Sequence, residues 1–146
     1  MNIFDELHNL NFPQDAYVVV GSGHLIALGL KESTDIDIVV TPELFEKCYQ
    51  DASWEQVPWT YPEKLGQIFL RRGVVELYLD VNAGDFNPST AELIKRAVVI
   101  DNIPFASLED VLAFKKEYLK NKPKHQKDIE VIEKYLEDRK VRITMQ

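Results

Sequence analysis

The sequence predicts an α/β (α+β) fold, in which a small mixed β-sheet is flanked by helices and two further helices end the chain. Short runs of β-branched and aromatic residues alternate with segments of helical periodicity. The first run stops at a glycine turn, Gly21-Ser22-Gly23, that opens a helix. A length of 146 residues, with 45% hydrophobic and 28% charged residues, is typical of one globular domain. We therefore expect a single domain over residues 1–146.

Charge and cysteine content narrow the classes of function. The 24 acidic and 17 basic residues give a net charge of -7, which disfavours nucleic acid as a partner because such binding neutralises phosphates. Cys48 is the single cysteine and cannot form an internal disulfide, which suits a reducing cytoplasm. The N-terminal segment has no signal-peptide pattern, and no run reaches the ~18 apolar residues of a membrane span. We expect a cytoplasmic protein with no membrane segment.

The first half of the chain is predicted to contain three helices and two strands. Apolar residues at helical spacing, closed by Pro13, predict a short first helix. Thr41-Pro42-Glu43 places an N-cap, a first-turn proline and an acid at the start of another helix. In order, we expect a helix over residues 2–10, a strand over 17–20, a helix that ends at Leu30, a strand that carries Asp35 and Asp37, and a helix from Thr41 through Tyr49.

Residues 51–66 show no firm periodicity. They contain Trp54, Trp59 and Tyr61, together with two prolines. The stretch is either the wall of a binding site or a loop whose aromatic side chains plug the edge of the core. The second arrangement is the more common one, because surface loops often anchor themselves in this way.

The second half is predicted to contain two hairpins and three helices. β-Type runs over residues 67–70 and 74–81 flank Arg71-Arg72-Gly73, and alternation places Glu76, Tyr78 and Asp80 on one face. The elements that follow are a short helix through Arg96, strands over 98–100 and 103–106, a helix from Ser107 whose apolar face excludes Lys115, a break at Asn121-Lys122-Pro123, and a last helix over 125–138.

The turn at Gly21-Ser22-Gly23 does not match three well-known glycine motifs. A dinucleotide fingerprint needs a third glycine where this chain has Ile26, a P-loop ends in Gly-Lys-Ser/Thr, and a nucleophile elbow reads Gly-x-Ser-x-Gly. What remains is a glycine-serine turn before a helix, whose free N–H groups favour phosphate oxygens. We expect this turn to bind phosphate.

Two acids follow on the next predicted strand. Asp35 and Asp37 are two residues apart, so they point to one face with Cβ atoms ~7 Å apart. Such carboxylates can converge on Mg²⁺, and a pair of Mg²⁺ ions can activate an attacking oxygen and neutralise a leaving one. A solvated strand edge is the ordinary alternative for an isolated Asp-x-Asp, but the Gly-Ser turn beside it favours a site.

Residues 21–40 resemble the signature of the nucleotidyltransferase superfamily with the DNA polymerase β-type fold. In that family a Gly-Ser turn and helix precede an Asp-x-Asp strand, and this chain has Gly21, Ser22, Asp35 and Asp37 in those places. The stretch from Lys31 to Asp35, with the hydroxyls of Ser33 and Thr34, is similar to the Arg-x-Ser/Thr-x-Asp-x-Asp form of small bacterial members.

The resemblance extends to the C-terminal helices and to a third acid. Lys115, Lys127 and Asp128 match the family's inward lysine and its Lys-Asp helix start, while His125 stands where relatives often carry arginine. The third acid of the family lies on a hydrophobic strand. Val75-Glu76-Leu77 matches that pattern best, and Asp80 remains a competitor.

The resemblance implies a Mg²⁺-dependent transfer of a nucleoside monophosphate from an NTP, such as ATP, to a small-molecule or protein acceptor. Gly21, Ser22, Ser33, Thr34, Lys115 and Lys127 would bind the nucleotide, Asp35, Asp37 and Glu76 would hold two metal ions, and Glu76 or Asp80 would act on the acceptor hydroxyl. One alternative is a noncatalytic or protein-modifying member of a toxin-antitoxin pair, with a partner protein or a homo-oligomer. Another is a plain metal-binding or structural domain.

Overall fold

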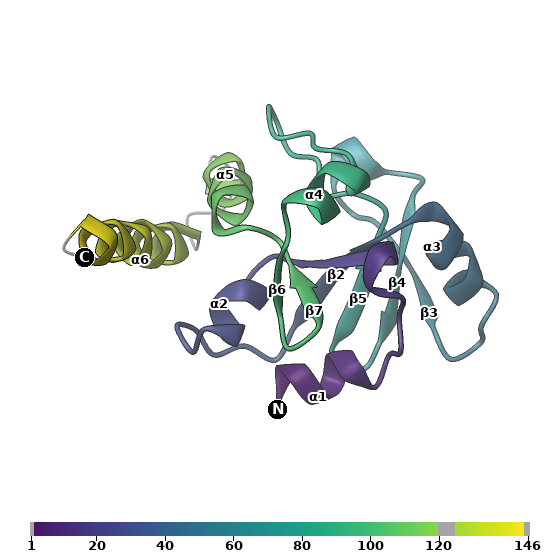
Figure 1. Cartoon of the computed structure of the whole chain (residues 1–146). Coiled ribbons are helices and arrows are strands. Elements are labelled where there is room, and N and C mark those ends of the chain that lie inside the picture. Colours follow the sequence, from purple (N-terminus) through teal and green to yellow (C-terminus); the bar gives the residue numbers. More distant parts are fainter. Residues whose placement is uncertain (1, 120–124, 145–146) are drawn as a thin grey trace.

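The computed structural model describes residues 2–119 and 125–144. Within this part of the chain, seven strands form one mixed sheet with the order β3-β4-β5-β2-β1-β7-β6 (Figure 1). β2 runs parallel to β5 and β1 runs parallel to β7, while the other neighbours are antiparallel. The predicted mixed sheet flanked by helices is therefore confirmed.

The elements follow the predicted order closely. The strands are β1 (Tyr17–Val20), β2 (Ile36–Val40), β3 (Glu55–Pro58), β4 (Ile68–Arg72), β5 (Val75–Tyr78), β6 (Val98–Ile100) and β7 (Ile103–Phe105). The α-helices are α1 (Ile3–His8), α2 (Gly23–Ala27), α3 (Pro42–Tyr49), α4 (Thr90–Arg96), α5 (Leu108–Leu119) and α6 (Gln126–Thr144), and short 3-10 turns cover Gln14–Ala16 and Pro62–Lys64.

Two helix starts show why the sequence predicted them. The Thr41 hydroxyl accepts a hydrogen bond from the Leu44 N–H at 3.3 Å, and Pro42 occupies the first turn of α3. α4 begins with a reciprocal capping box, in which Ser89 and Glu92 each accept a hydrogen bond from the other's N–H. Local side-chain chemistry fixes both boundaries.

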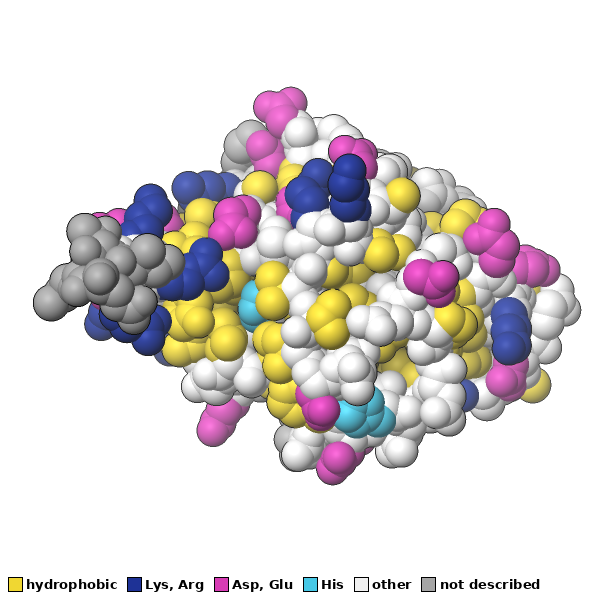
Figure 2. All heavy atoms as spheres, viewed as in Figure 1, with side chains coloured by type: hydrophobic (Ala, Val, Ile, Leu, Met, Phe, Trp, Pro, Cys, Tyr) yellow, Lys and Arg dark blue, Asp and Glu magenta, His cyan; other side chains and the backbone are white. Residues whose placement is uncertain are grey.

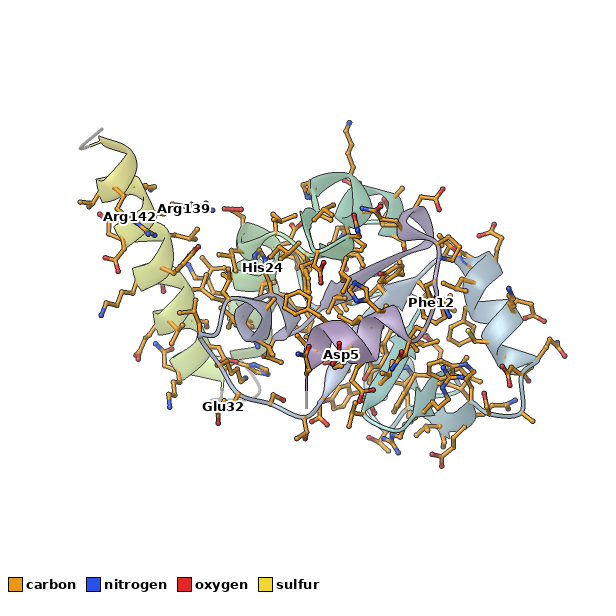
Figure 3. All side chains as sticks on the ribbon, turned by 60° about the horizontal axis from the view of Figure 1, so that its bottom comes forward. Asp5, Phe12, His24, Glu32, Arg139 and Arg142 are labelled. Atoms are coloured by element: carbon orange, nitrogen blue, oxygen red, sulfur yellow. The ribbon has the colours of Figure 1, made fainter. Side chains whose placement is uncertain are left out.

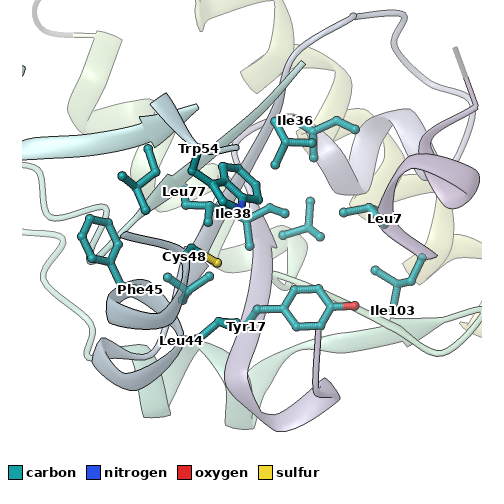
Figure 4. Packing of buried hydrophobic residues seen from close by; sticks show 14 of the residues in the cluster. Leu7, Tyr17, Ile36, Ile38, Leu44, Phe45, Cys48, Trp54, Leu77 and Ile103 are labelled. Carbon is teal, nitrogen blue, oxygen red and sulfur yellow. The ribbon is translucent and has the colours of Figure 1, made fainter. Parts of the chain in front are cut away.

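The sheet separates two hydrophobic clusters. On one face, residues of α1 and α3 and the buried Trp54 pack against alternate residues of β2 and β5, such as Ile38 and Leu77 (Figure 4). On the other face, residues of α4, α5 and α6 cover Val39 and its neighbours. Asp37 lies between Ile38 and Ile36 in sequence and therefore shares the face of Val39. Asp37 consequently points toward the side of α5 and α6.

One strand was missed, and several predicted boundaries were wrong. β2 begins at Ile36, so Asp35 precedes the strand on which it was predicted to lie. β3 was not predicted, because this edge strand is mostly exposed on both faces and carries no alternating pattern. β5 ends at Tyr78, beyond which it has no register partner in β2 or β4, so Asp80 follows the strand. α2 ends at Ala27 instead of Leu30, and α6 continues to Thr144 instead of Asp138.

The long helix α6 extends past α5 and away from the sheet, with Arg139 and Arg142 on its outer part (Figures 1 and 3). Several lysine and arginine side chains gather at this end on the face shown in Figure 2. The predicted break at residues 121–123 lies outside the described residues. No helix in the described ranges 2–119 and 125–144 is both long and apolar enough to cross a membrane.

Candidate functional site

A cavity of about 360 Å³ opens where β1, β2 and β5 face α5 and α6. Three groups of side chains line it. The carboxylate group is Asp35, Asp37 and Glu76; the lysine group is Ser22, Lys31, Lys115 and Asp128; the aromatic ledge is Trp59 and Tyr61 with Lys64. These groups come from segments that are far apart in the sequence.

The carboxylate group is built by strand register. Asp37 on β2 is the direct neighbour of Glu76 on the parallel strand β5, and Asp35 lies just before β2. Burial, and to a smaller extent the negative charges of Glu76 and Asp35, raise the pKa of Asp37 to about 6, although Lys115 and Tyr78 act in the opposite direction. Asp37 is therefore a buried acid with two further acids beside it.

Glu76 is held by its neighbours at both carboxylate oxygens. Arg71, its register partner on β4, donates to Oε2 from Nε at 3.0 Å and from Nη2 at 2.9 Å. The Tyr78 hydroxyl donates to Oε1 at 2.7 Å. Donors at both oxygens fix the orientation of the carboxylate, and the arginine also offsets its charge. Glu76 is thus a rigidly positioned acid beside Asp37.

Asp80, the competitor for the third acid, is placed differently. It lines the cavity but follows the end of β5, and its Oδ1 accepts hydrogen bonds from Lys64 Nζ at 2.8 Å and from the Asn82 N–H at 3.0 Å. Lys64 is largely buried at this contact, with 13% of its side chain exposed. Asp80 is therefore paired with a lysine on the side of the aromatic ledge.

The glycine turn lies against Asp37. Val20, the last residue of β1, is the register partner of Asp37, and Gly21 follows it with φ +61°. A Cβ atom on Gly21 would lie 2.8 Å from Asp37 Oδ2, so both the backbone conformation and the space require glycine. A Cβ atom on Gly23 would overlap Cγ1 of Val19. The absence of a side chain at Gly21 therefore lets the turn lie directly against the Asp37 carboxylate.

Asp128 organises the lysine group. Its Oδ2 accepts hydrogen bonds from Lys31 Nζ at 2.6 Å and from Lys115 Nζ at 2.9 Å. The Ser22 hydroxyl also donates to it, at 3.4 Å, and accepts from Lys31 at 2.9 Å and from Lys115 at 3.2 Å. Two ammonium groups share one carboxylate, which leaves a net positive charge on the Ser22 side of the cavity.

The two charged partners at the centre of the lysine group shift each other's pKa. Lys115 is 1% exposed, and burial lowers its pKa although Asp128 opposes this. Burial raises the pKa of Asp128, but the hydrogen bonds from Lys31 and Lys115 outweigh it and hold the pKa below its ordinary value. His125, which also lines the cavity, has Nδ1 3.4 Å from Lys115 Nζ.

Most of the residues that the sequence singled out line this cavity, and two do not. Gly21, Ser22, Ser33, Asp35, Asp37, Glu76, Asp80 and Lys115 line it. Thr34 and Lys127 are exposed and lie outside its lining. The prediction that Lys115 lies outside the apolar face of α5 was wrong, because its position four residues after Val111 and seven after Leu108 places it on the buried face, where it pairs with Asp128. Ser33 accepts the Asp35 N–H at 3.2 Å and shapes the turn before β2.

Sequence reasoning did not include Lys31 and Asp128 among the site residues. Lys31 lies in the loop before Ser33, and Asp128 lies in the first turn of α6. The available signal was the similarity of both positions to family motifs, without any pattern that joins them across 97 residues. Their association depends on how α6 packs on α5.

The aromatic ledge answers the open question about residues 51–66. Trp54 is 5% exposed and plugs the core, where Arg72 lies 4.3 Å from its ring centroid. Trp59 instead lines the cavity, with ring centroids 5.5 Å from Tyr61 and 5.3 Å from Tyr78. The core-plug interpretation is therefore confirmed for Trp54, and the binding-wall interpretation stays a prediction for Trp59, which lines a cavity.

The carboxylate group suits a hard divalent cation. Among the residues that the structure describes, no three His, Cys, Asp or Glu side chains are already gathered as a metal cage. The residues nevertheless fit Mg²⁺, because it prefers carboxylate oxygens with substrate phosphates and water as further ligands. Burial and the neighbouring carboxylates raise the pKa of Asp37, and a divalent cation would favour its ionised form. Asp37, Asp35 and Glu76 are the residues that could hold the ion.

Comparison of the chain with protein-family models, with curated proteins and with solved structures finds no match. The geometry of the cavity is therefore what bears on its function.

Proposed function

We propose that this chain has the nucleotidyltransferase fold and moves a nucleoside monophosphate from an NTP to a hydroxyl-bearing acceptor, with Mg²⁺ as its cofactor. The observation that carries the proposal is the position of Asp37, beside Glu76 on one side and against the Gly21 turn on the other. A cation held there would face acidic side chains and phosphate oxygens together.

In this proposal the positively charged residues bind the phosphates, and the acidic residues bind the metal ion. Lys31 and Lys115 offset the β- and γ-phosphates beside Ser22, since the lysine group carries surplus positive charge. Bound Mg²⁺ would supply charge neutralisation at the α-phosphate. Arg71 and Tyr78 keep the Glu76 carboxylate in a fixed orientation next to Asp37. These residues act mainly by positioning and electrostatics, as is usual in phosphoryl transfer.

The transfer exchanges a phosphoanhydride bond of the NTP for a phosphoester bond to the acceptor. The acceptor oxygen forms a bond to the α-phosphorus, and the bond from the α-phosphorus to the oxygen that bridges to the β-phosphate breaks. Pyrophosphate leaves with that electron pair, and the hydroxyl proton passes to a carboxylate of the site and then to water. The attacking and leaving oxygens lie roughly in line.

The proposal is tested by ligand-induced stabilisation. MgATP, MgGTP, MgCTP and MgUTP are titrated separately, and the melting temperature is followed for the wild type and for Asp35→Asn/Asp37→Asn. At least one nucleotide should stabilise the wild type in the presence of Mg²⁺, and the double variant should lose that shift. Asp5→Asn/Glu6→Gln is the control, because it removes two exposed acids of α1 and should keep the shift. If no nucleotide stabilises the wild type, or if the Asp35/Asp37 variant keeps the full shift, the proposed site is wrong.

A further inference from the structure

The aromatic ledge has no role in binding the phosphates. Its side chains extend from Trp59 to Tyr61 and Lys64, next to Tyr78 and Asp80, and all of them line the same cavity as the lysine group. The Lys64 ammonium is 2.8 Å from Asp80 and 5.0 Å from the Trp59 ring centroid. This end of the cavity is therefore aromatic and nearly balanced in charge.

The strand order fixes where the ledge lies relative to the other groups. Tyr78 and Glu76 belong to β5, Asp37 belongs to β2, and Ser22 follows β1. Because the sheet order is β5-β2-β1, Asp37 stands between the ledge side and the Ser22 side. Lys115 on α5 and Asp128 on α6 both hydrogen-bond with Ser22. The ledge and the lysine group are thus at opposite ends of the cavity, with the carboxylate group between them.

The order of the three groups along the cavity matches what an in-line displacement requires. If pyrophosphate leaves toward the lysine group, the attacking oxygen must arrive from the opposite side of the α-phosphate. That side is formed by Glu76, Tyr78 and the aromatic ledge. A molecule bound on the ledge would have its hydroxyl directed at the carboxylate group.

We propose that the aromatic ledge is the acceptor subsite, and that the acceptor is a small hydroxyl-bearing molecule with a ring that packs against Trp59 and Tyr61. This proposal rests on the proposed transferase function. Aromatic side chains favour the flat face of a ring, because stacked rings bury apolar surface with favourable geometry. The Lys64–Asp80 pair leaves no surplus charge that would require a strongly charged acceptor. A protein side chain would need contacts outside the cavity, whereas a small ring needs only the ledge.

The experiment uses α-labelled NTPs as donors and a cell extract divided into a low-mass fraction and a protein fraction. The wild type should label a low-mass compound. Trp59→Leu should lower the yield of that product about tenfold when the low-mass fraction is dilute, and a concentrated fraction should restore it. Trp59→Phe, which keeps a ring, should retain most of the yield. Trp54→Phe is the matched control, because Trp54 lies in the core and does not line the cavity.

A second measurement separates the acceptor from the donor. The melting temperature of each variant is taken without ligand and with the MgNTP that stabilises the wild type. Trp59→Leu should keep the wild-type shift, since the ledge does not hold the phosphates. If Trp59→Leu loses the nucleotide shift, or forms the product at the wild-type yield, the ledge is not the acceptor subsite. Label on proteins instead of a low-mass compound also overturns the proposal.

The failure of the transferase function has a different signature. In that case the wild type transfers no label to either fraction, and the acceptor proposal falls with the function on which it rests. The outcomes that overturn only the acceptor subsite all include labelling by the wild type. The two failures are therefore distinguishable in one set of assays.

Discussion

The carboxylate group and the lysine group face each other across one cavity, but they are built and balanced in opposite ways. Asp37 and Glu76 are neighbours in register on adjacent strands, so backbone pairing sets their separation. Lys31, Lys115 and Asp128 come from a loop and two helices and meet only through tertiary packing. The first group places three acids around a buried position, and the second places two ammonium groups on one carboxylate.

The contrast shows which group can serve which partner. Acids that repel one another at Asp37 gain most from a cation, whereas two lysines already anchored by Asp128 can meet phosphate oxygens without moving far. Preorganised charge of this kind is effective because it costs little reorganisation during a reaction. Substitutions in the carboxylate group should therefore act mainly on transfer and on Mg²⁺ dependence, whereas substitutions in the lysine group should also lower the stability of the fold.

The largest expected effect concerns the third acid of the carboxylate group. Glu76→Gln should lower nucleotide transfer by about 10²–10³-fold, because it removes a fixed negative charge beside Asp37. Asp80→Asn should change transfer only a few-fold, since Asp80 is paired with Lys64 beyond the end of β5. Steady-state transfer from α-labelled NTP measures both. Equal losses in the two variants would mean that strand register does not identify the third acid.

The next effect concerns the stability that the lysine group contributes. Asp128→Asn leaves the 2% exposed Lys115 side chain without its carboxylate and should lower the free energy of unfolding by about 3 kcal/mol. Asp128→Asn/Lys115→Met should recover much of this loss, because no unpaired charge then stays buried. Denaturant titration measures the change, with the exposed Asp138→Asn on the same helix as control. If Asp128→Asn is as stable as the control, the pair does not stabilise the fold.

The same contrast explains what the sequence could predict. Asp35 and Asp37 were recognisable because residues two apart on a strand must share a face, and the glycine turn marked the end of β1. The sequence predicted that Glu76 belongs to the site, but it did not predict that Glu76 is the direct neighbour of Asp37. That adjacency depends on the order of the strands in the sheet, which the sequence of neither strand determines. The inward position of Lys115 contradicted the predicted apolar face of α5, although its spacing from Leu108 and Val111 places it on that face and the family resemblance implied an inward lysine. β3 escaped prediction because an exposed edge strand carries little pattern.

The third effect is a pH dependence of the carboxylate group. The pKa of Asp37 is raised from 3.8 to about 6, so the native state binds more protons than the unfolded state between these two values. The free energy of unfolding should therefore fall as pH rises through this window, by roughly 2–3 kcal/mol in total. Asp37→Asn removes this dependence and should be the more stable protein at pH 7.5 in EDTA, with the difference vanishing below pH 4.

Urea titrations of the wild type and Asp37→Asn between pH 3.5 and 8 measure this difference. Thr41→Ser, at the cap of α3, is a control for which the pH profile should keep its wild-type shape. An Asp37→Asn profile parallel to that of the wild type would show that Asp37 ionises normally. In that case, the excess negative charge at the centre of the carboxylate group would be disproved.

The smallest expected effect concerns the groups that hold Glu76. Arg71→Lys keeps a positive charge but cannot donate from two nitrogens to Oε2, so the carboxylate should become less well oriented. We expect the Mg²⁺ concentration for half-maximal stabilisation by the nucleotide to rise about tenfold, the lower end for a residue that orients a metal ligand. Arg72→Lys is the matched control, because Arg72 contacts Trp54 and Ser53 and lies outside the cavity lining. If both variants show the wild-type Mg²⁺ dependence, the orientation of Glu76 does not matter for the cation. The carboxylate group would then act through its total charge alone, in contrast to the lysine group, where each hydrogen bond to Asp128 has a defined partner.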